Sequence, residues 1–126
     1  MSGQIVHFEL PVDDFDRASG FYGELFGWGI TPMGPTSAMA RTAPSDEYGR
    51  PSEPGAINGA FARRAEPISV PVLTIGVDDI DKTLERIQTL GGNLVQAKTP
   101  VGDIGFVAYF TDSESNTVGL WENAKS

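Results

Sequence analysis

The sequence contains no cysteine and one histidine among its 126 residues. The absence of cysteine excludes disulfide bonds, thiolate catalysis and cysteine zinc sites, and it fits a reducing compartment. A lone imidazole binds a divalent ion too weakly for a defined cofactor, because such sites need three or more protein ligands. The chemistry of the single histidine, His7, is therefore the first question that the sequence raises.

Long apolar runs and basic clusters are also absent. No stretch approaches the roughly 20 apolar residues of a membrane span, and "MSGQIVHFEL" lacks the basic and apolar regions of a signal peptide. The formal net charge of -8 opposes nucleic-acid binding, and Arg63 and Arg64 form the one close basic pair. We therefore expect a cytoplasmic protein with no nucleic-acid partner and no membrane contact.

The residues that are present have the composition of one folded domain. The hydrophobic fraction is 40% and the charged fraction is 21%, which is too low to suggest disorder. A chain of this length can bury a core without covalent or metal cross-links. We expect a single domain over residues 1–126.

An internal repeat organises this domain. "VDDFDRASGFYGELFG" from Val12 aligns without gaps on "VDDIDKTLERIQTLGG" from Val77, a shift of 77 − 12 = 65 residues. Each copy predicts a strand that ends at Val-Asp-Asp, an acidic N-cap, an amphipathic helix and a glycine stop. The candidate caps are Asp13 or Asp14 and Asp78 or Asp79. The apolar positions predicted to face the core are Phe15, Ala18, Phe21 or Tyr22, and Leu25 in the first copy, and Ile80, Leu84, Ile87 and Leu90 in the second.

Three extended segments are predicted after each helix, separated by turns rich in Pro, Gly, Asp, Ser and Asn. They cover residues 28–33, 37–42 and 57–63 in the first half, and residues 93–98, 105–111 and 117–122 in the second. This pattern predicts an α+β fold of two tandem βαβββ units, at about residues 4–64 and 68–123. Residues 43–56, with three prolines and two glycines, are expected to form a flexible surface loop. The alternative is a lid formed by Tyr48 and Arg50.

The opening "HFELPVDDFDRASGFYGELFGW" and the ending "GFVAYFTDSESNTVGLWE" resemble the vicinal oxygen chelate superfamily. This group includes glyoxalase I, extradiol dioxygenases, fosfomycin-resistance enzymes and bleomycin-binding proteins. The closer resemblance is to glyoxalase-like proteins related to lactoylglutathione lyase. It implies that each unit curls its strands into a half-open cup and that the paired cups surround one cleft. Because the superfamily includes several chemistries and some pure binders, the resemblance specifies fold better than function.

Metal-using members of this superfamily place ligands on the first and last strands of each unit. His7 matches the first-strand position, and its counterpart one repeat later is Val72. The last-strand position is Gly119, and Asn58 or Gly59 is expected to be its first-unit counterpart. We therefore expect no cofactor. The alternative is a divalent metal bound unconventionally through His7 and Glu9.

Loss of the ligands would leave a roomier and more apolar cleft. The residues predicted to bind a small molecule there are His7, Glu9, Thr74, Gly119 and Trp121, with His7 and Glu9 also a candidate catalytic pair. The carboxylate of Glu9 is expected to favour a protonated His7. The remaining wall is predicted to be Phe106, Ala108 and Phe110, or alternatively Val107 and Tyr109. An anionic ligand could meet Arg41 or Arg63 if either turned inward, although solvent exposure is the default for both.

Three functions follow from this reading. The first is metal-independent binding of a small apolar or aromatic molecule, with Trp121 as a stacking surface. The second is a lyase or isomerase that uses either a metal or His7 and Glu9 as an acid-base pair. The third is a structural or regulatory role of the protein surface. A homodimer is expected in each case, since an open strand edge favours pairing.

Overall fold

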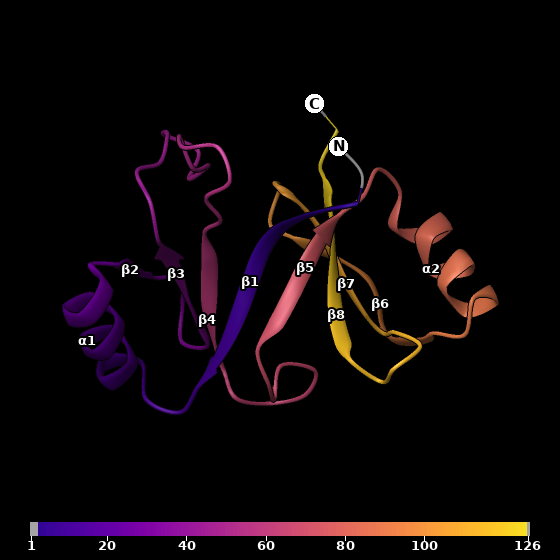
Figure 1. Cartoon of the computed structure of the whole chain (residues 1–126), viewed down its shortest axis with the longest axis horizontal. Helices are drawn as coiled ribbons and strands as arrows, with labels where there is room; N and C mark the ends of the chain where they lie inside the picture. Colours follow the sequence, from indigo (N-terminus) through magenta and orange to yellow (C-terminus); the bar gives the residue numbers. More distant parts are fainter. Residues whose placement is uncertain (1–2, 126) are drawn as a thin grey trace. The chain divides into compact units, whose positions relative to one another are not determined.

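The computed structural model describes residues 3–125 and forms an α+β fold, as predicted (Figure 1). The chain divides into two compact units, which are described separately. The first unit is His7–Pro71, and the second combines residues 3–6 with residues 72–125. No helix within residues 3–125 is long and apolar enough to cross a membrane.

The strands of the first unit follow the order β2-β3-β4-β1. Strands β1 and β4 are parallel, whereas β2 is antiparallel to β3 and β3 to β4. The first residues of β1 are grouped with the second unit. The elements are β1 (Gln4–Val12), α1 (Phe15–Phe26), β2 (Gly29–Pro32), β3 (Ser37–Arg41) and β4 (Gly59–Arg63).

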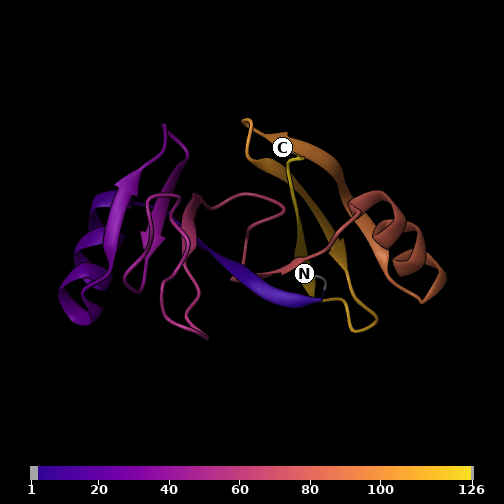
Figure 2. The same cartoon turned by 90° about the horizontal axis from the view of Figure 1, so that it is seen from above.

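The second unit repeats this arrangement with the strand order β5-β8-β7-β6. Strands β5 and β8 are parallel, and the other neighbouring pairs are antiparallel. Figure 2 shows each helix on one side of its own unit's strands. The two βαβββ units predicted from the repeat are thus present. The elements are β5 (Val72–Gly76), α2 (Ile80–Thr89), β6 (Asn93–Val101), β7 (Gly105–Thr111) and β8 (Thr117–Asn123).

The second aspartate of each Val-Asp-Asp sequence caps the helix that follows. Asp14 accepts a hydrogen bond from the Arg17 backbone N–H at 2.9 Å, and Asp79 accepts one from Lys82 at 3.1 Å. These bonds satisfy amide groups that have no partner within the first helical turn. Helix α1 ends at Gly27, whose φ of 75° lies in the left-handed region that glycine adopts readily.

Each helix packs on its sheet through fewer residues than the periodicity predicted. In α1, Tyr22 rather than Phe21 faces the core, where its ring stacks on Trp28 at a centroid distance of 4.7 Å. The predictions for Leu25 and Leu90 were wrong, since these side chains are 59% and 64% exposed. Leu90 is the C-cap of α2 and lies beyond its last helical turn. In each copy, the last position of the predicted apolar period is therefore exposed.

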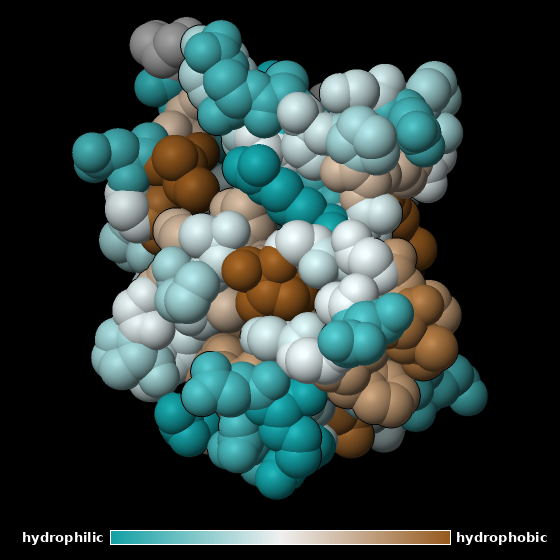
Figure 3. Space-filling model, turned by 90° about the vertical axis from the view of Figure 1, so that its left-hand side faces the viewer, coloured by the Kyte–Doolittle hydropathy of each residue, from teal (hydrophilic) through white to brown (hydrophobic). Residues whose placement is uncertain are grey.

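Exposed apolar side chains are therefore spread along α1. Phe21, Leu25 and Phe26 are each about 60% exposed. Figure 3 views the molecule from the side where α1 lies, and brown apolar groups there are separated by teal hydrophilic ones. Single exposed apolar residues are normal on a protein surface.

The loop over residues 43–56 is organised by hydrogen bonds, which its proline and glycine content did not predict. The Asp46 carboxylate accepts bonds from the backbone N–H groups of Tyr48 and Arg50 at 2.9 and 3.0 Å. Asn58 donates from Nδ2 to Ser45 Oγ at 2.8 Å and to the Gly49 carbonyl at 3.0 Å. The buried Asn58 therefore ties the loop to the start of β4.

Candidate functional site

In the first unit, one face of the sheet packs on α1 and the other, the open face, points away from it. Phe8, Leu10 and Val12 contact the core that includes α1. Because neighbouring residues of a strand point to opposite faces, His7 and Glu9 lie on the open face. The structure thus brings these two predicted site residues together on one strand.

The second unit has the same two faces. Ile75 and Leu120 belong to the core that contacts α2, which leaves Thr74, Gly119 and Trp121 on the open face. Val72, at the position that corresponds to His7, is fully buried on this face. The predicted site residues therefore form two groups, one on the open face of each unit.

Thr74 and Gly119 are direct partners in the pairing of β5 and β8. A Cβ atom added at Gly119 would lie 2.9 Å from Thr74 Oγ1, which is closer than real side-chain contacts allow. The Thr74 hydroxyl is buried and has no hydrogen-bond partner within the described residues 3–125. An unpaired buried hydroxyl costs free energy, so Thr74 is a notable polar group on an otherwise apolar face.

Trp121 is half-buried, and its orientation is fixed by two neighbours. The indole N–H donates to Asn123 Oδ1 at 2.8 Å. The six-membered part of the ring lies over Gly105, where any side chain would overlap it. The N–H, which is the polar group of the indole, thus already has a hydrogen-bond partner. The ring itself packs against the sheet.

The strand pairing also decides between the two predicted walls. Val107 is the partner of Trp121 and Tyr109 is the partner of Gly119, so both β7 residues lie on the open face. The alternative prediction for the wall is therefore the correct one. The first-named set was wrong, because Phe106, Ala108 and Phe110 face the α2 core.

Burial lowers the pKa of the His7 imidazole below its ordinary value of 6.5. This direction contradicts the expectation that Glu9 would favour protonation, because desolvation of the charged ring has the larger effect. His7 is therefore neutral at neutral pH. A neutral imidazole has one nitrogen that can accept a proton or a hydrogen bond.

The family's metal-ligand positions do not fit a metal ion in this chain. Glu9 pairs with Ala60 in the same way that Thr74 pairs with Gly119. The counterpart of Gly119 is therefore Ala60, and the prediction of Asn58 or Gly59 was wrong. Asn58 uses its amide in the loop, where its Oδ1 accepts from the Thr42 N–H at 2.8 Å. Of the family's four ligand positions, His7 alone carries a side-chain atom that can coordinate a metal ion.

The described residues also contain no other cluster suited to a metal. Within residues 3–125, no three His, Cys, Asp or Glu side chains gather closely enough to hold an ion. We therefore derive no chemical step through a metal.

Glu122 is a buried charged residue that the sequence analysis did not single out. Its Oε1 accepts from the Ile80 backbone N–H at 2.8 Å, and its Oε2 lies 3.1 Å from Lys98 Nζ. The bond from Ile80 holds the pKa of the Glu122 carboxyl below its usual value. Glu122 faces the start of α2, so its role is to stabilise the helix. No sequence signal pointed to this contact, because Ile80 and Glu122 are 42 residues apart in the chain.

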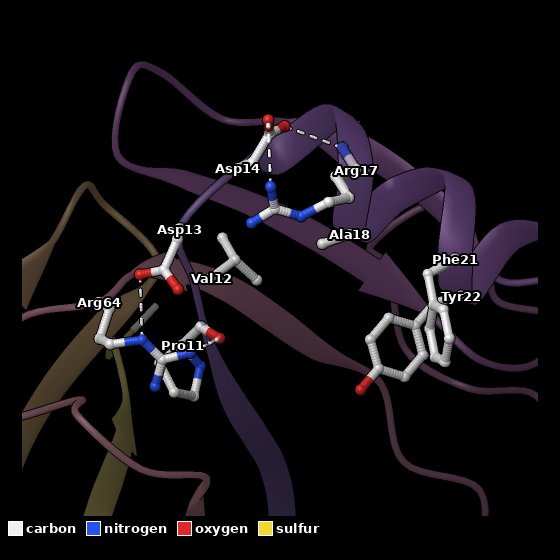
Figure 4. Close-up of a pocket in the computed structure, with 9 residues that line it drawn as sticks. All are labelled: Pro11, Val12, Asp13, Asp14, Arg17, Ala18, Phe21, Tyr22 and Arg64. Atoms are coloured by element: carbon white, nitrogen blue, oxygen red, sulfur yellow. Dashed lines mark hydrogen bonds and ion pairs between the residues drawn. The ribbon is translucent and has the colours of Figure 1, made fainter.

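A separate surface cavity of about 290 Å³ lies beside the start of α1 (Figure 4). Arg64 pairs with Asp13 at 3.1 Å, and Arg17 lies 3.9 Å from Asp14. The charged groups around the cavity therefore neutralise one another. None of the predicted site residues lines it. The lining residues are Pro11, Val12, Asp13, Asp14, Arg17, Ala18, Phe21, Tyr22 and Arg64.

Comparison with known proteins agrees with this fold. The family described as "Bleomycin resistance protein-like N-terminal" matches residues 4–41. A glyoxylase-like domain-containing protein of Didymella fabae is 32% identical over 93% of this chain and 91% of its own length. A lactoylglutathione lyase of Haemophilus influenzae is 26% identical, over 95% of this chain and 93% of its own length.

Solved structures of other proteins share this fold. Methylmalonyl-CoA epimerase of Streptomyces coelicolor, in complex with 2-nitronate-propionyl-CoA, has a TM-score of 0.70 at 16% identity. The alignment covers 99% of this chain and 100% of the epimerase chain. At this identity the comparison supports the fold alone. Together with the repeated βαβββ units, these findings show that the chain belongs to the glyoxalase-like proteins of the vicinal oxygen chelate superfamily.

Proposed function

We propose that this protein binds a small aromatic or apolar molecule on the open face of its second unit, without the family metal. The observation that carries the proposal is the fixed orientation of Trp121. Its ring lies over Gly105 while its N–H is bonded to Asn123. A flat aromatic surface that is already oriented loses little conformational entropy when a ligand stacks on it.

The neighbours of Trp121 support an apolar ligand. Val107 is the strand partner of Trp121, and Tyr109 lies on the same face. The indole N–H of Trp121 is already bonded to Asn123, so stacking is the contact that the ring offers to a ligand. Apolar walls with a few polar groups are typical of small-molecule sites.

Binding can be tested by isothermal titration calorimetry with 2-naphthol and naphthalene. We expect both compounds to bind the wild-type protein and Trp121→Ala to weaken binding about tenfold or more. Trp28→Phe is the matched control, because Trp28 packs among Phe8, Tyr22 and Phe26 rather than on the open face. Equal binding by the wild type and Trp121→Ala would refute the proposal.

A second candidate function is supported by the lowered pKa of His7. A neutral imidazole can act as a general base at neutral pH, and Glu9 shares its face of β1. The protein would then be a lyase or isomerase in which His7 transfers a proton and Glu9 orients the His7 imidazole. An assay of S-lactoylglutathione formation, with and without added divalent metal, tests this candidate. Activity that His7→Ala leaves unchanged would rule it out.

We also propose that the protein works in the cytoplasm as a homodimer. The support is the lack of cysteine and the edges of β2 and β6, which pair with no further strand within residues 3–125. Analytical ultracentrifugation of the full chain tests the dimer, and a monomer at micromolar concentration would contradict it.

A further inference from the structure

Arg41 lies on the open face of the first unit. In the sheet, Glu9 pairs with Ala60 and Ala60 pairs with Met39, so Met39 shares the face of Glu9. Arg41 follows Met39 by two residues on β3 and therefore points to the same side. Because β3 is antiparallel to β4 and β4 is parallel to β1, Arg41 and His7 lie at the same end of this face.

The other arginines near this sheet are already engaged. Arg63 lies on the helix face, with its guanidinium 5.4 Å from the centre of the Phe15 ring. Arg64 is paired with Asp13. Arg41 is exposed and forms no hydrogen bond or ion pair within residues 3–125. Of the two strand arginines that the sequence analysis considered, the structure thus leaves Arg41 available on the open face.

The face that carries Arg41 is built mainly of small residues. Ala60 and Ala62 give the centre of the face a low, apolar floor beside Met39. The loop over residues 43–56 borders this floor through Gly49. A Cβ atom at Gly49 would lie 3.7 Å from Met39 Sδ and 3.8 Å from Arg41 Nη2. Gly49 has a φ of 80°, which favours glycine, and its missing side chain leaves the guanidinium uncovered.

From this arrangement we propose that the open face of the first unit binds a small carboxylate, with its charged group on Arg41 and its apolar part on Met39 and Ala60. A guanidinium donates two parallel hydrogen bonds to a carboxylate, which fixes the ligand's orientation. Glu9 on the same face and the net charge of -8 disfavour ligands with more than one negative charge. The proposal is independent of the aromatic site, because Arg41 belongs to the first unit and Trp121 to the second.

Calorimetric titration with hexanoate and its uncharged analogue hexanamide tests this site. We expect hexanoate to bind the wild-type protein and Arg41→Gln to raise its dissociation constant about tenfold or more. Arg63→Gln, which removes the same charge from the helix face, should change the constant by less than about twofold. Hexanamide should bind the wild type as weakly as hexanoate binds Arg41→Gln.

The single histidine supplies a second readout. Its imidazole C–H signal in the NMR spectrum needs no assignment, since the chain has one His. Hexanoate should shift this signal in the wild type and in Arg63→Gln but not in Arg41→Gln. The proposal is refuted if hexanoate does not bind, if Arg41→Gln binds it normally, or if hexanamide binds equally well. Thermal unfolding of each variant verifies that it is folded.

Discussion

The strands of the two units pair in the same register, but the side chains on their open faces differ in chemical character. Glu9 pairs with Ala60 in the first unit, and Thr74 pairs with Gly119 in the second. The first face presents His7, Glu9 and Arg41 around a floor of small residues. The second presents Trp121 and Tyr109 around a single buried hydroxyl. Duplicated backbone geometry therefore does not require duplicated chemistry.

The helix faces differ at one corresponding position. Glu122 follows Gly119 by three residues, just as Arg63 follows Ala60. In the second unit, the Glu122 carboxylate accepts a hydrogen bond from Ile80 at the start of α2. In the first unit, Arg63 lies over the Phe15 ring at the start of α1. A buried charge-assisted hydrogen bond thus stabilises one helix start, and a partly exposed cation–ring contact stabilises the other.

Substitutions at this corresponding position should give the largest difference between the units. Glu122→Ala leaves the Ile80 N–H and Lys98 without their partner and should lower the free energy of unfolding by about 2 kcal/mol. Arg63→Ala removes a contact at the surface and should cost about 0.5 kcal/mol. Urea unfolding of both variants measures the two values. Equal costs would show that the two helix starts depend on their partners to the same degree.

The two units should also respond oppositely to replacement of a threonine by valine. Thr74→Val removes an unpaired buried hydroxyl and should raise the free energy of unfolding by about 1 kcal/mol. Thr42→Val removes a hydroxyl that donates to the Ile57 carbonyl at 2.6 Å and should lower it by about 1 kcal/mol. The same urea experiment compares them. Destabilisation by Thr74→Val would mean that the hydroxyl already has a partner, such as a bound water.

The smallest expected effect is the pH dependence that His7 gives to stability. Because its pKa is lower in the folded chain than the ordinary 6.5, the unfolded chain binds the proton more readily. The contribution of His7 to the free energy of unfolding is therefore fully present above about pH 6.5 and decreases as the pH drops below this value. The slope should be a fraction of the about 1.4 kcal/mol per pH unit that one full proton would give.

His7→Gln should remove this slope and leave the rest of the pH profile unchanged. Urea unfolding between about pH 7.5 and 5.5 isolates it from the carboxylates, which titrate at lower pH. Val72, at the corresponding position of the second unit, has no ionisable group. A stability that rose below pH 6.5 in the wild type would contradict the desolvation of His7.

The repeat predicted the fold well because its signals are local. Val-Asp-Asp followed by an apolar period and glycine specifies a strand end, a cap and a helix within about 16 residues. The site was harder to predict, because it depends on pairing between distant strands. The comparison of Asn58 with Gly119 failed for this reason, since only the register of β1 with β4 identifies Ala60 as the counterpart.

The sequence by itself determined the two βαβββ units, an aspartate cap at the start of each helix, and the presence of Val72 and Gly119 at two of the family's ligand positions. These follow from residue identity and from spacing along the chain. The tertiary structure alone decided which β7 residues accompany Trp121, which arginine shares the face of His7, and which direction the His7 pKa takes. Those properties depend on strand register and burial, which arise only when segments distant in the sequence come together.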